Sequence, residues 1–358
     1  MRKRILSFIL SLALCLSLLA ACKSAAPPPA IETVPFTDSA GRAVDIPANA
    51  AKISPSGPLA QMFLLAIAPE LLVTAASEYA ERDRRYIPES VLALPVVGAF
   101  YGTADLNLEA VAKIGPELVI DVGETKTAIA EDMDSITAAI AVPAVHIEAT
   151  LATAPQAFRT LGKILNREER GEILALFCEK ILKQTDDIMG QVGDNKVSAL
   201  YCLGDAGLNV LARGSFHSEV LDYVTDNLAV ADAPSAKGNG NETDLEQISL
   251  WNPQVILFAP NSVFADAAGD PVWSKLDAVK NGEYYEAPSG PYSWMGTPPS
   301  VNRYLGMLWL TRVLYPDFAD YDLYEEVADY YALFYHYELD RAGFGALTEN
   351  AVQRGNLS

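Results

Sequence analysis

Short, predominantly apolar segments alternate with amphipathic segments along most of this chain. The apolar segments with the length of strands are residues 72–76, 118–122, 144–147, 197–202, 255–258 and 284–287. They lack the strict alternation of apolar and polar residues that is typical of a strand with one solvent-exposed face. Such runs are typical of parallel sheets covered by helices on both faces. The pattern therefore predicts an α/β fold built on parallel sheets.

One helix–strand unit occurs twice. Residues 108–120 (Leu-Glu-Ala-Val-Ala-Lys-Ile-Gly-Pro-Glu-Leu-Val-Ile) match residues 245–257 (Leu-Glu-Gln-Ile-Ser-Leu-Trp-Asn-Pro-Gln-Val-Ile-Leu) at a constant offset of 137. Each copy predicts a short amphipathic helix, a Gly-Pro or Asn-Pro break and a buried strand. The repeat predicts two Rossmann-like lobes of similar plan.

The segment between the two copies has a helical pattern. Residues 153–190 contain no proline after Pro155, and their apolar residues fall mostly at helical spacing. We predict one long or slightly broken connecting helix here. It would join an N-terminal lobe (32–152) to a C-terminal lobe (191–318), with a C-terminal helix and tail at 319–358. Two lobes joined by a single helix form a clamp, with the ligand cleft between them.

The N-terminal residues have the parts of a secretory signal. Arg2, Lys3 and Arg4 precede an apolar run that ends in Leu-Ala-Ala-Cys at 19–22. This ending resembles a bacterial lipoprotein signal, in which residues 1–21 are removed and Cys22 carries lipid. Residues 22–31 would then be a Pro/Ala-rich tether. The alternatives are an ordinary signal peptide or a membrane anchor, for which the apolar run is short.

Composition limits the partners of the body. The formal charge of −20 over 358 residues opposes binding to nucleic acid or to an anionic membrane surface. Half of the residues are hydrophobic, which is enough for packed cores in two domains. Cys178 falls in a helical pattern and Cys202 ends a predicted strand, so we expect two buried free thiols rather than a disulfide.

The order of parts resembles the extracytoplasmic solute-binding proteins of ABC importers for iron chelates, haem and cobalamin. The resemblance runs from Phe-Thr-Asp-Ser-Ala-Gly-Arg at 36–42 to the apolar helix at 300–315. The motif Leu-Glu-x-Val-x-x-x-x-Pro-x-Leu-Val-Ile at 108–120 is its most recognisable part. It implies a lipid-anchored, non-enzymatic binding protein with a stiff hinge and no resident cofactor. The implied partners are a permease dimer and a metal chelate, first an iron–siderophore; haem, cobalamin or an oxyanion such as molybdate are alternatives.

Two glutamates occupy equivalent positions in the repeat, Glu109 and Glu246. The resemblance implies that each pairs with arginines of one permease subunit, and like charges on a two-fold body would set docking orientation. Thr243 with Glu246 also forms a plausible capping box. Leu106 corresponds to Thr243 and cannot cap, so a shared glutamate without a shared cap favours docking. A solvated helix face is the other interpretation.

Candidate ligand-binding residues follow the predicted strands of the first lobe. The turn at 54–58 contains Ser54, Ser56 and Gly57, and its backbone N–H groups at a helix start favour an anionic group. Tyr101 and Glu124 lie in the next loops, which would face the same way. An ordinary strand-to-helix turn with serine caps has the same features.

The second lobe contributes a loop and an aromatic segment. His217 enters a helix, and Tyr292 and Trp294 stand beside glycine and proline just before the apolar helix that contains Arg303. Aromatic side chains on a rigid loop suit a large organic chelate. Trp294 is as plausible in the core, and Arg303 is as plausible bonded to the C-terminal segment.

Other chemistries lack their motifs. The three histidines have no metal-ligand spacing, so no bare metal site is expected. A hydrolase would need a nucleophile–base pair, for which Ser215 and His217 are the only local candidates. A ligand-free interaction lipoprotein is the third class.

Overall fold

The structure, a computed structural model, describes residues 32–100, 106–235 and 238–352, and Val34 onward forms one compact unit. The predicted signal, tether and Cys22 lie outside the described residues, as does Tyr101. Within the described ranges, no helix combines the length and apolar character needed to cross a bilayer.

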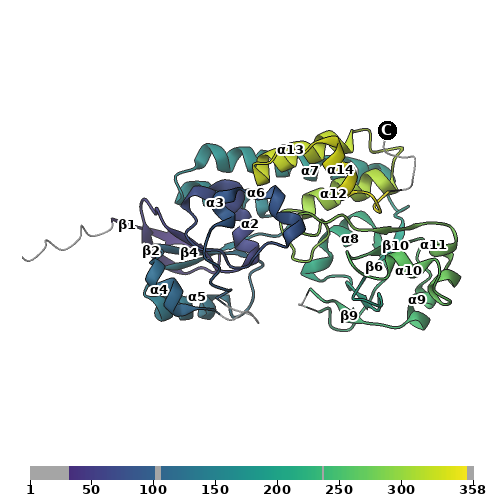
Figure 1. Ribbon diagram of the computed structural model, residues 1–358, viewed down its shortest axis with the longest axis horizontal. Coiled ribbons are helices and arrows are strands. Elements are labelled where there is room, and N and C mark those ends of the chain that lie inside the picture. Colours follow the sequence, from purple (N-terminus) through teal and green to yellow (C-terminus); the bar gives the residue numbers. More distant parts are fainter. Residues whose placement is uncertain (1–31, 101–105, 236–237, 353–358) are drawn as a thin grey trace, which may run out of the picture. The chain divides into compact units, whose positions relative to one another are not determined.

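The N-terminal lobe is built on a parallel sheet in the order β3-β4-β5 (Figure 1). Its strands are β3 (Ile53–Pro55), β4 (Leu118–Gly123) and β5 (Ala144–Glu148). A separate two-stranded sheet pairs β1 (Thr33–Thr37) with β2 (Ala43–Pro47). The helices are α2 (Pro58–Ile67), η1 (Pro69–Leu71), η2 (Glu81–Tyr86), α3 (Glu89–Leu92), α4 (Leu108–Ile114) and α5 (Ile129–Ile140).

The expected strand at 72–76 is wrong as a regular strand. Leu72 makes an isolated bridge to Ile53, and Ala75 makes another to Val96. The segment changes partner within three residues, so neither pairing extends into a ladder.

The C-terminal lobe has a mixed sheet in the order β11-β10-β6-β7-β9, with β8 also on β6. Its strands are β6 (Ser198–Leu203), β7 (Asn209–Val210), β8 (Asp226–Asn227), β9 (Asn241–Glu242), β10 (Val255–Phe258) and β11 (Tyr284–Glu286). The pairs among β6, β10 and β11 are parallel as predicted, β8 adds a further parallel pair, and β7 and β9 add antiparallel pairs. The helices are η3 (Phe216–Ser218), α8 (Glu219–Val224), α9 (Leu245–Trp251), α10 (Phe264–Ala267), η4 (Trp273–Lys275), α11 (Asp277–Lys280) and α12 (Arg303–Leu314).

The sequence repeat is a structural repeat. The first copy is α4 followed by β4, and the second is α9 followed by β10. Both helices end at a residue in the left-handed conformation, Gly115 in one and Asn252 in the other. Both strands are central: β4 lies between β3 and β5, and β10 lies between β6 and β11, all in parallel. Two lobes of similar plan are therefore present.

One apolar core is shared by the two sheets. Ile120 of β4 and Leu257 of β10 belong to the same cluster, together with the buried faces of α2, α7 and α12. The opposite face of each sheet packs in a cluster of its own, which contains Val119 in the first lobe and Ile256 in the second. The predicted burial of both sheet faces is therefore confirmed.

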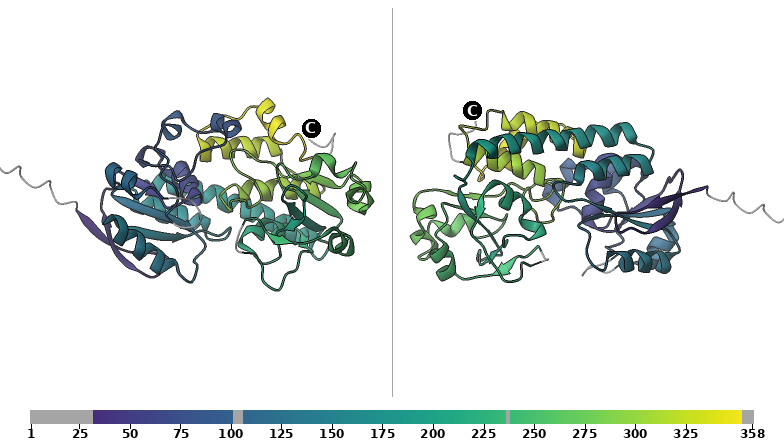
Figure 2. Two further views of the ribbon diagram at one scale, coloured as in Figure 1. Left: turned by 60° about the horizontal axis from the view of Figure 1, so that its bottom comes forward. Right: turned by 180° about the vertical axis from the view of Figure 1, so that it is seen from behind.

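The connecting segment is two helices rather than the one long or slightly broken helix predicted for 153–190. α6 (Ala154–Ile164) ends, and α7 (Glu168–Val192) folds back along it, as Figure 2 shows. Gly162 and Gly171 lie where the helices touch, since a Cβ on Gly162 would be 3.3 Å from the Gly171 Cα. Glycine at both positions permits this close approach, which helical spacing alone does not reveal.

The C-terminal segment also forms two helices, α13 (Leu323–Tyr335) and α14 (Arg341–Leu347), where one helix and a tail were expected. Aromatic side chains of α13 are buried in the shared core, and Tyr330 stacks on Phe334 with ring centroids 4.2 Å apart. Cys178 and Cys202 are buried free thiols, as expected. Burial raises the pKa of Cys202 to about 12, so it is a neutral packing residue.

Candidate functional site

A cavity of about 500 Å³ lies between the two lobes. Its first wall is formed by the turn after β3, with Ser56 and Gly57, and by Glu124 after β4. Its second wall is formed by Phe216 and His217 of η3. The carboxyl ends of parallel strands are where α/β sheets present their binding loops. We call this the Ser56–His217 cavity.

Four of the predicted ligand residues thus meet in one cavity: Ser56, Gly57, Glu124 and His217. Ser54 does not join them. It is fully buried in β3, and its hydroxyl lies 2.7 Å from the hydroxyl of Thr74. Ser54 therefore belongs to the packing behind the turn.

The predicted aromatic wall is wrong in its placement. Trp294 has no exposed surface and lies in the shared core, where the backbone of Gly306 in α12 packs directly on it. Tyr292 packs against Tyr79, with ring centroids 5.8 Å apart, and does not line the Ser56–His217 cavity. Both side chains pack on the core, because the loop folds over the core and not along the cleft.

Arg303 is 2% exposed and does not line the cavity either. It forms an ion pair with Glu219, and its guanidinium stacks on the ring of Phe216 at 4.7 Å. Burial lowers the pKa of Arg303 and raises that of Glu219, while their mutual attraction opposes both shifts. Arg303 therefore supports Phe216 from behind. Phe216 adjoins His217 in the sequence but was not among the predicted ligand residues.

A buried network holds the Ser56 turn in place. The Ser56 hydroxyl donates to Asp121 Oδ1 at 2.5 Å, and His146 Nδ1 donates to Asp121 Oδ2 at 2.6 Å. His146 Nε2 lies 3.1 Å from the Thr125 hydroxyl. The carboxylate separates the histidine from the serine, so the histidine is not a general base for this hydroxyl. The network fixes the turn to β4 and β5.

The candidate hydrolytic pair does not form. His217 Nδ1 lies 2.7 Å from the carbonyl of Gly296, which can only accept, so this nitrogen carries the proton. The Ser215 hydroxyl accepts from the backbone N–H of His217 at 3.1 Å and donates to the Ser235 carbonyl. Ser215 acts as a cap, and the imidazole points elsewhere.

The charges of the cavity are mostly negative. Asp121, Glu124 and Asp132 contribute carboxylates, whereas Lys126 contributes an ammonium group 3.8 Å from Glu124 Oε1. Apolar surface comes from α2, α5 and Phe216. This surrounding suits a ligand with an apolar body and without strong negative charge.

Glu109 and Glu246 are exposed in the first turns of α4 and α9. The N-caps are Asn107 and Asp244, which are equivalent in the repeat and accept from Ala110 and Gln247. The expectation that the two helices share no cap is therefore wrong. The capping residue is one position later than the capping-box pattern suggested.

Comparisons with known proteins agree with this architecture. Residues 63–291 match a family model described as periplasmic binding protein. The Fe(3+)-citrate-binding protein YfmC of Bacillus subtilis is 24% identical over 186 residues, which cover 51% of this chain and 56% of YfmC. The chain thus matches about half the length of this curated relative.

Solved structures match over nearly their whole length. An ABC transporter solute-binding protein from Sulfurospirillum deleyianum is 26% identical with a TM-score of 0.80, covering 88% of this chain and 99% of that one. The molybdate-bound periplasmic binding protein MolA of Haemophilus influenzae is 19% identical with a TM-score of 0.69, covering 86% and 99%. At that identity MolA shows the fold alone.

Proposed function

Because this chain belongs to the periplasmic binding protein family, we propose that it captures an iron chelate in the Ser56–His217 cavity and delivers it to an ABC importer. The observation that carries the proposal is the cavity itself, since Ser56 and Glu124 of one lobe face Phe216 and His217 of the other. A ligand that contacts both lobes favours one relative position of the lobes. A permease would recognise the protein in that position.

A siderophore-like chelate fits the cavity better than an oxyanion. Glu124 and Asp132 would repel molybdate, and Pro58 at the first helical position supplies no N–H group to an anion. Phe216 and the apolar start of α2 suit the organic body of a chelate. Haem and cobalamin are alternatives of the same transport role.

Binding rather than catalysis is the proposed activity. The protein's family and its structural neighbours are binding proteins. The Ser215 hydroxyl and the His217 imidazole are bonded to different backbone carbonyls, so they do not make a nucleophile–base pair. Lipid attachment at Cys22 would hold the protein at the outer face of the cell membrane, and Glu109 and Glu246 would dock on the permease dimer.

Calorimetric titration tests the ligand class. The purified mature protein is titrated with ferrioxamine B, a cationic iron trihydroxamate, and in parallel with ferric citrate and molybdate. We expect the first complex to bind most tightly, because the cavity carboxylates disfavour the two anions. Glu124→Gln should reduce the difference in Kd between ferrioxamine B and ferric citrate, because it removes one cavity carboxylate. Glu89→Gln, at an exposed position of α3, should leave that difference unchanged. Tighter binding of molybdate than of either iron complex would contradict the proposal.

A further inference from the structure

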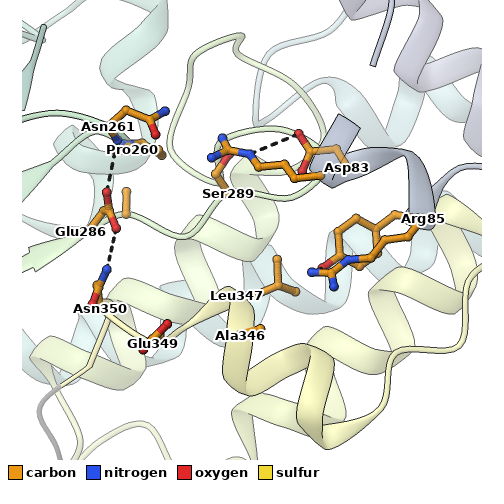
Figure 3. Close-up of a pocket in the computed structure, with 13 residues that line it drawn as sticks. Asp83, Arg85, Pro260, Asn261, Glu286, Ser289, Ala346, Leu347, Glu349 and Asn350 are labelled. Carbon is orange, nitrogen blue, oxygen red and sulfur yellow. Dashed lines mark hydrogen bonds and ion pairs between the residues drawn. The ribbon is translucent and has the colours of Figure 1, made fainter. Parts of the chain in front are cut away.

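A second cavity of about 220 Å³ lies between the lobes (Figure 3). Asn261 lines it and stands 137 positions after Glu124, each just past the central strand of its lobe. The facing wall comes from a short 3₁₀ helix of the other lobe: η2 in this cavity and η3 in the Ser56–His217 cavity. Both cavities therefore lie beyond the carboxyl end of a central strand, and the second is completed by the end of β11 and by residues 346–350.

The second cavity is lined by groups of both charges. Arg82 and Arg85 contribute guanidinium groups from η2. Across the cavity, Figure 3 shows Glu286 held by two donors. Its Oε1 accepts from the Asn261 backbone N–H at 3.2 Å, and its Oε2 accepts from Asn350 Nδ2 at 2.8 Å. This carboxylate is thus fixed in place at the end of β11.

Asp83 is a buried carboxylate on the same short helix as the two arginines. Its side chain is only 6% exposed, and it forms an ion pair with Arg82, whose Nε lies 3.7 Å from Asp83 Oδ2. Burial raises the pKa of Asp83, although its attraction to Arg82 and Arg85 opposes that shift. A cationic ligand group would give this buried carboxylate a second partner.

We propose that this second cavity, the Asp83–Glu286 cavity, binds a small zwitterion of the α-amino acid class. The ammonium group would donate to Asp83 and Glu286, and the carboxylate would accept from Arg85. A volume of about 220 Å³ suits an amino acid and excludes a siderophore complex. A bare metal ion is disfavoured, because no group of three His, Cys, Asp or Glu side chains suitable for a metal occurs within the described ranges.

The test uses the mature protein and the standard amino acids, titrated singly by calorimetry. For the amino acid that binds most tightly, the matched amine without its carboxylate and the matched acid without its ammonium group are titrated next. We expect each half-probe to bind at least tenfold more weakly, because the site pairs with both charges. Dissociation constants above about 10 mM for every amino acid, or equal binding of a half-probe, would overturn the proposal.

Variants locate the site. Asp83→Asn and Arg85→Gln should each weaken amino-acid binding at least tenfold, because each removes one charge-assisted contact. His217→Ala, in the other cavity, should leave it unchanged. His217→Ala should weaken the binding of ferrioxamine B, whereas Asp83→Asn and Arg85→Gln should leave it unchanged. Failure of the amino-acid site and failure of the chelate site are therefore separate outcomes. Unchanged amino-acid affinity in both Asp83→Asn and Arg85→Gln would place the ligand elsewhere and overturn the assignment.

Discussion

Asn107 and Asp244 cap the two repeat helices in the same way. Asn107 Oδ1 accepts from the Ala110 N–H at 2.9 Å, and Asp244 Oδ1 accepts from the Gln247 N–H at 2.8 Å. Both helices therefore begin without help from a glutamate. Glu109 and Glu246 make no ion pair or side-chain hydrogen bond within the described part of the chain. Because the caps are Asn107 and Asp244, the two exposed glutamates are not needed to cap their helices. Docking remains their proposed role.

The caps are expected to matter for stability. Asn107→Ala and Asp244→Ala should each lower the free energy of unfolding by about 0.5–2 kcal/mol, because an N–H group of the first turn loses its acceptor. Glu109→Gln and Glu246→Gln should change it by less than about 0.5 kcal/mol. Urea unfolding measures both sets, and a larger loss in the glutamate variants would mean that they do cap.

The docking proposal predicts a loss of transport without a loss of binding. Glu109→Arg combined with Glu246→Arg should abolish ligand uptake in cells, because like charges would face each other at the interface. The Kd for the chelate should not change, since neither residue lines the cavity.

A matched control separates docking from net charge. Glu89 and Glu168 are also exposed glutamates in the first turns of helices. Glu89→Arg with Glu168→Arg makes the same charge change and should transport normally. Equal loss in both double variants would assign the effect to overall charge.

Trp294 and Phe216 should behave differently on truncation. Trp294→Ala should lower the free energy of unfolding by about 3–5 kcal/mol, because it empties a fully buried site. Phe216→Ala should instead weaken chelate binding by about 1–3 kcal/mol, because its ring lines the cavity. Chemical unfolding and calorimetric titration of both variants distinguish the two roles. A weaker Kd in Trp294→Ala with unchanged stability would contradict the buried placement.

Asp83 predicts a pH-dependent stability. Its pKa is raised by burial, so between the usual and the raised pKa the folded protein keeps a proton that the unfolded chain has lost. Stability from this group is therefore present below about pH 3.9 and is lost as pH rises through the raised pKa. Asp83→Asn should be more stable than the wild type at neutral pH and similar below that value. Unfolding at both pH values checks this, with Asp194→Asn on the exposed surface as the control; no neutral-pH gain would mean that Asp83 is well solvated.

Lipid attachment is a prediction from the sequence alone. Labelled fatty acid should enter the wild-type protein in cells and be absent from Cys22→Ser, because the thiol is the acceptor. Cys15→Ser, within the predicted signal, serves as the control and should be labelled normally. Label retained by Cys22→Ser would exclude the lipoprotein interpretation.

The parts of the fold that local patterns encode were predictable. The run Val255–Phe258 is a strand within the predicted bounds, and the 137-residue offset correctly implied two similar lobes. The fold-back of α7 on α6 was not predictable, because it depends on contact between Gly162 and Gly171. Helical periodicity is the same in a straight helix and in a hairpin.

The same limit applies to the site. Ser56, Gly57, Glu124 and His217 follow strand ends or begin helices, and strand topology brings them together. Trp294 stands in a loop of the same kind, yet its side chain turns into the core. Loop position indicates which edge of a sheet a residue occupies, but the direction of its side chain depends on packing with distant helices such as α12.

The apolar layer common to both sheets has a consequence for how the protein unfolds. Ile120 and Leu257 lie in different lobes but pack in the same apolar cluster, so unfolding of either lobe removes packing contacts from both. Neither lobe has a complete core of its own. The two lobes should therefore unfold as a single cooperative unit with one calorimetric transition. Although the chain has the repeat of two domains, its thermodynamics should be those of one.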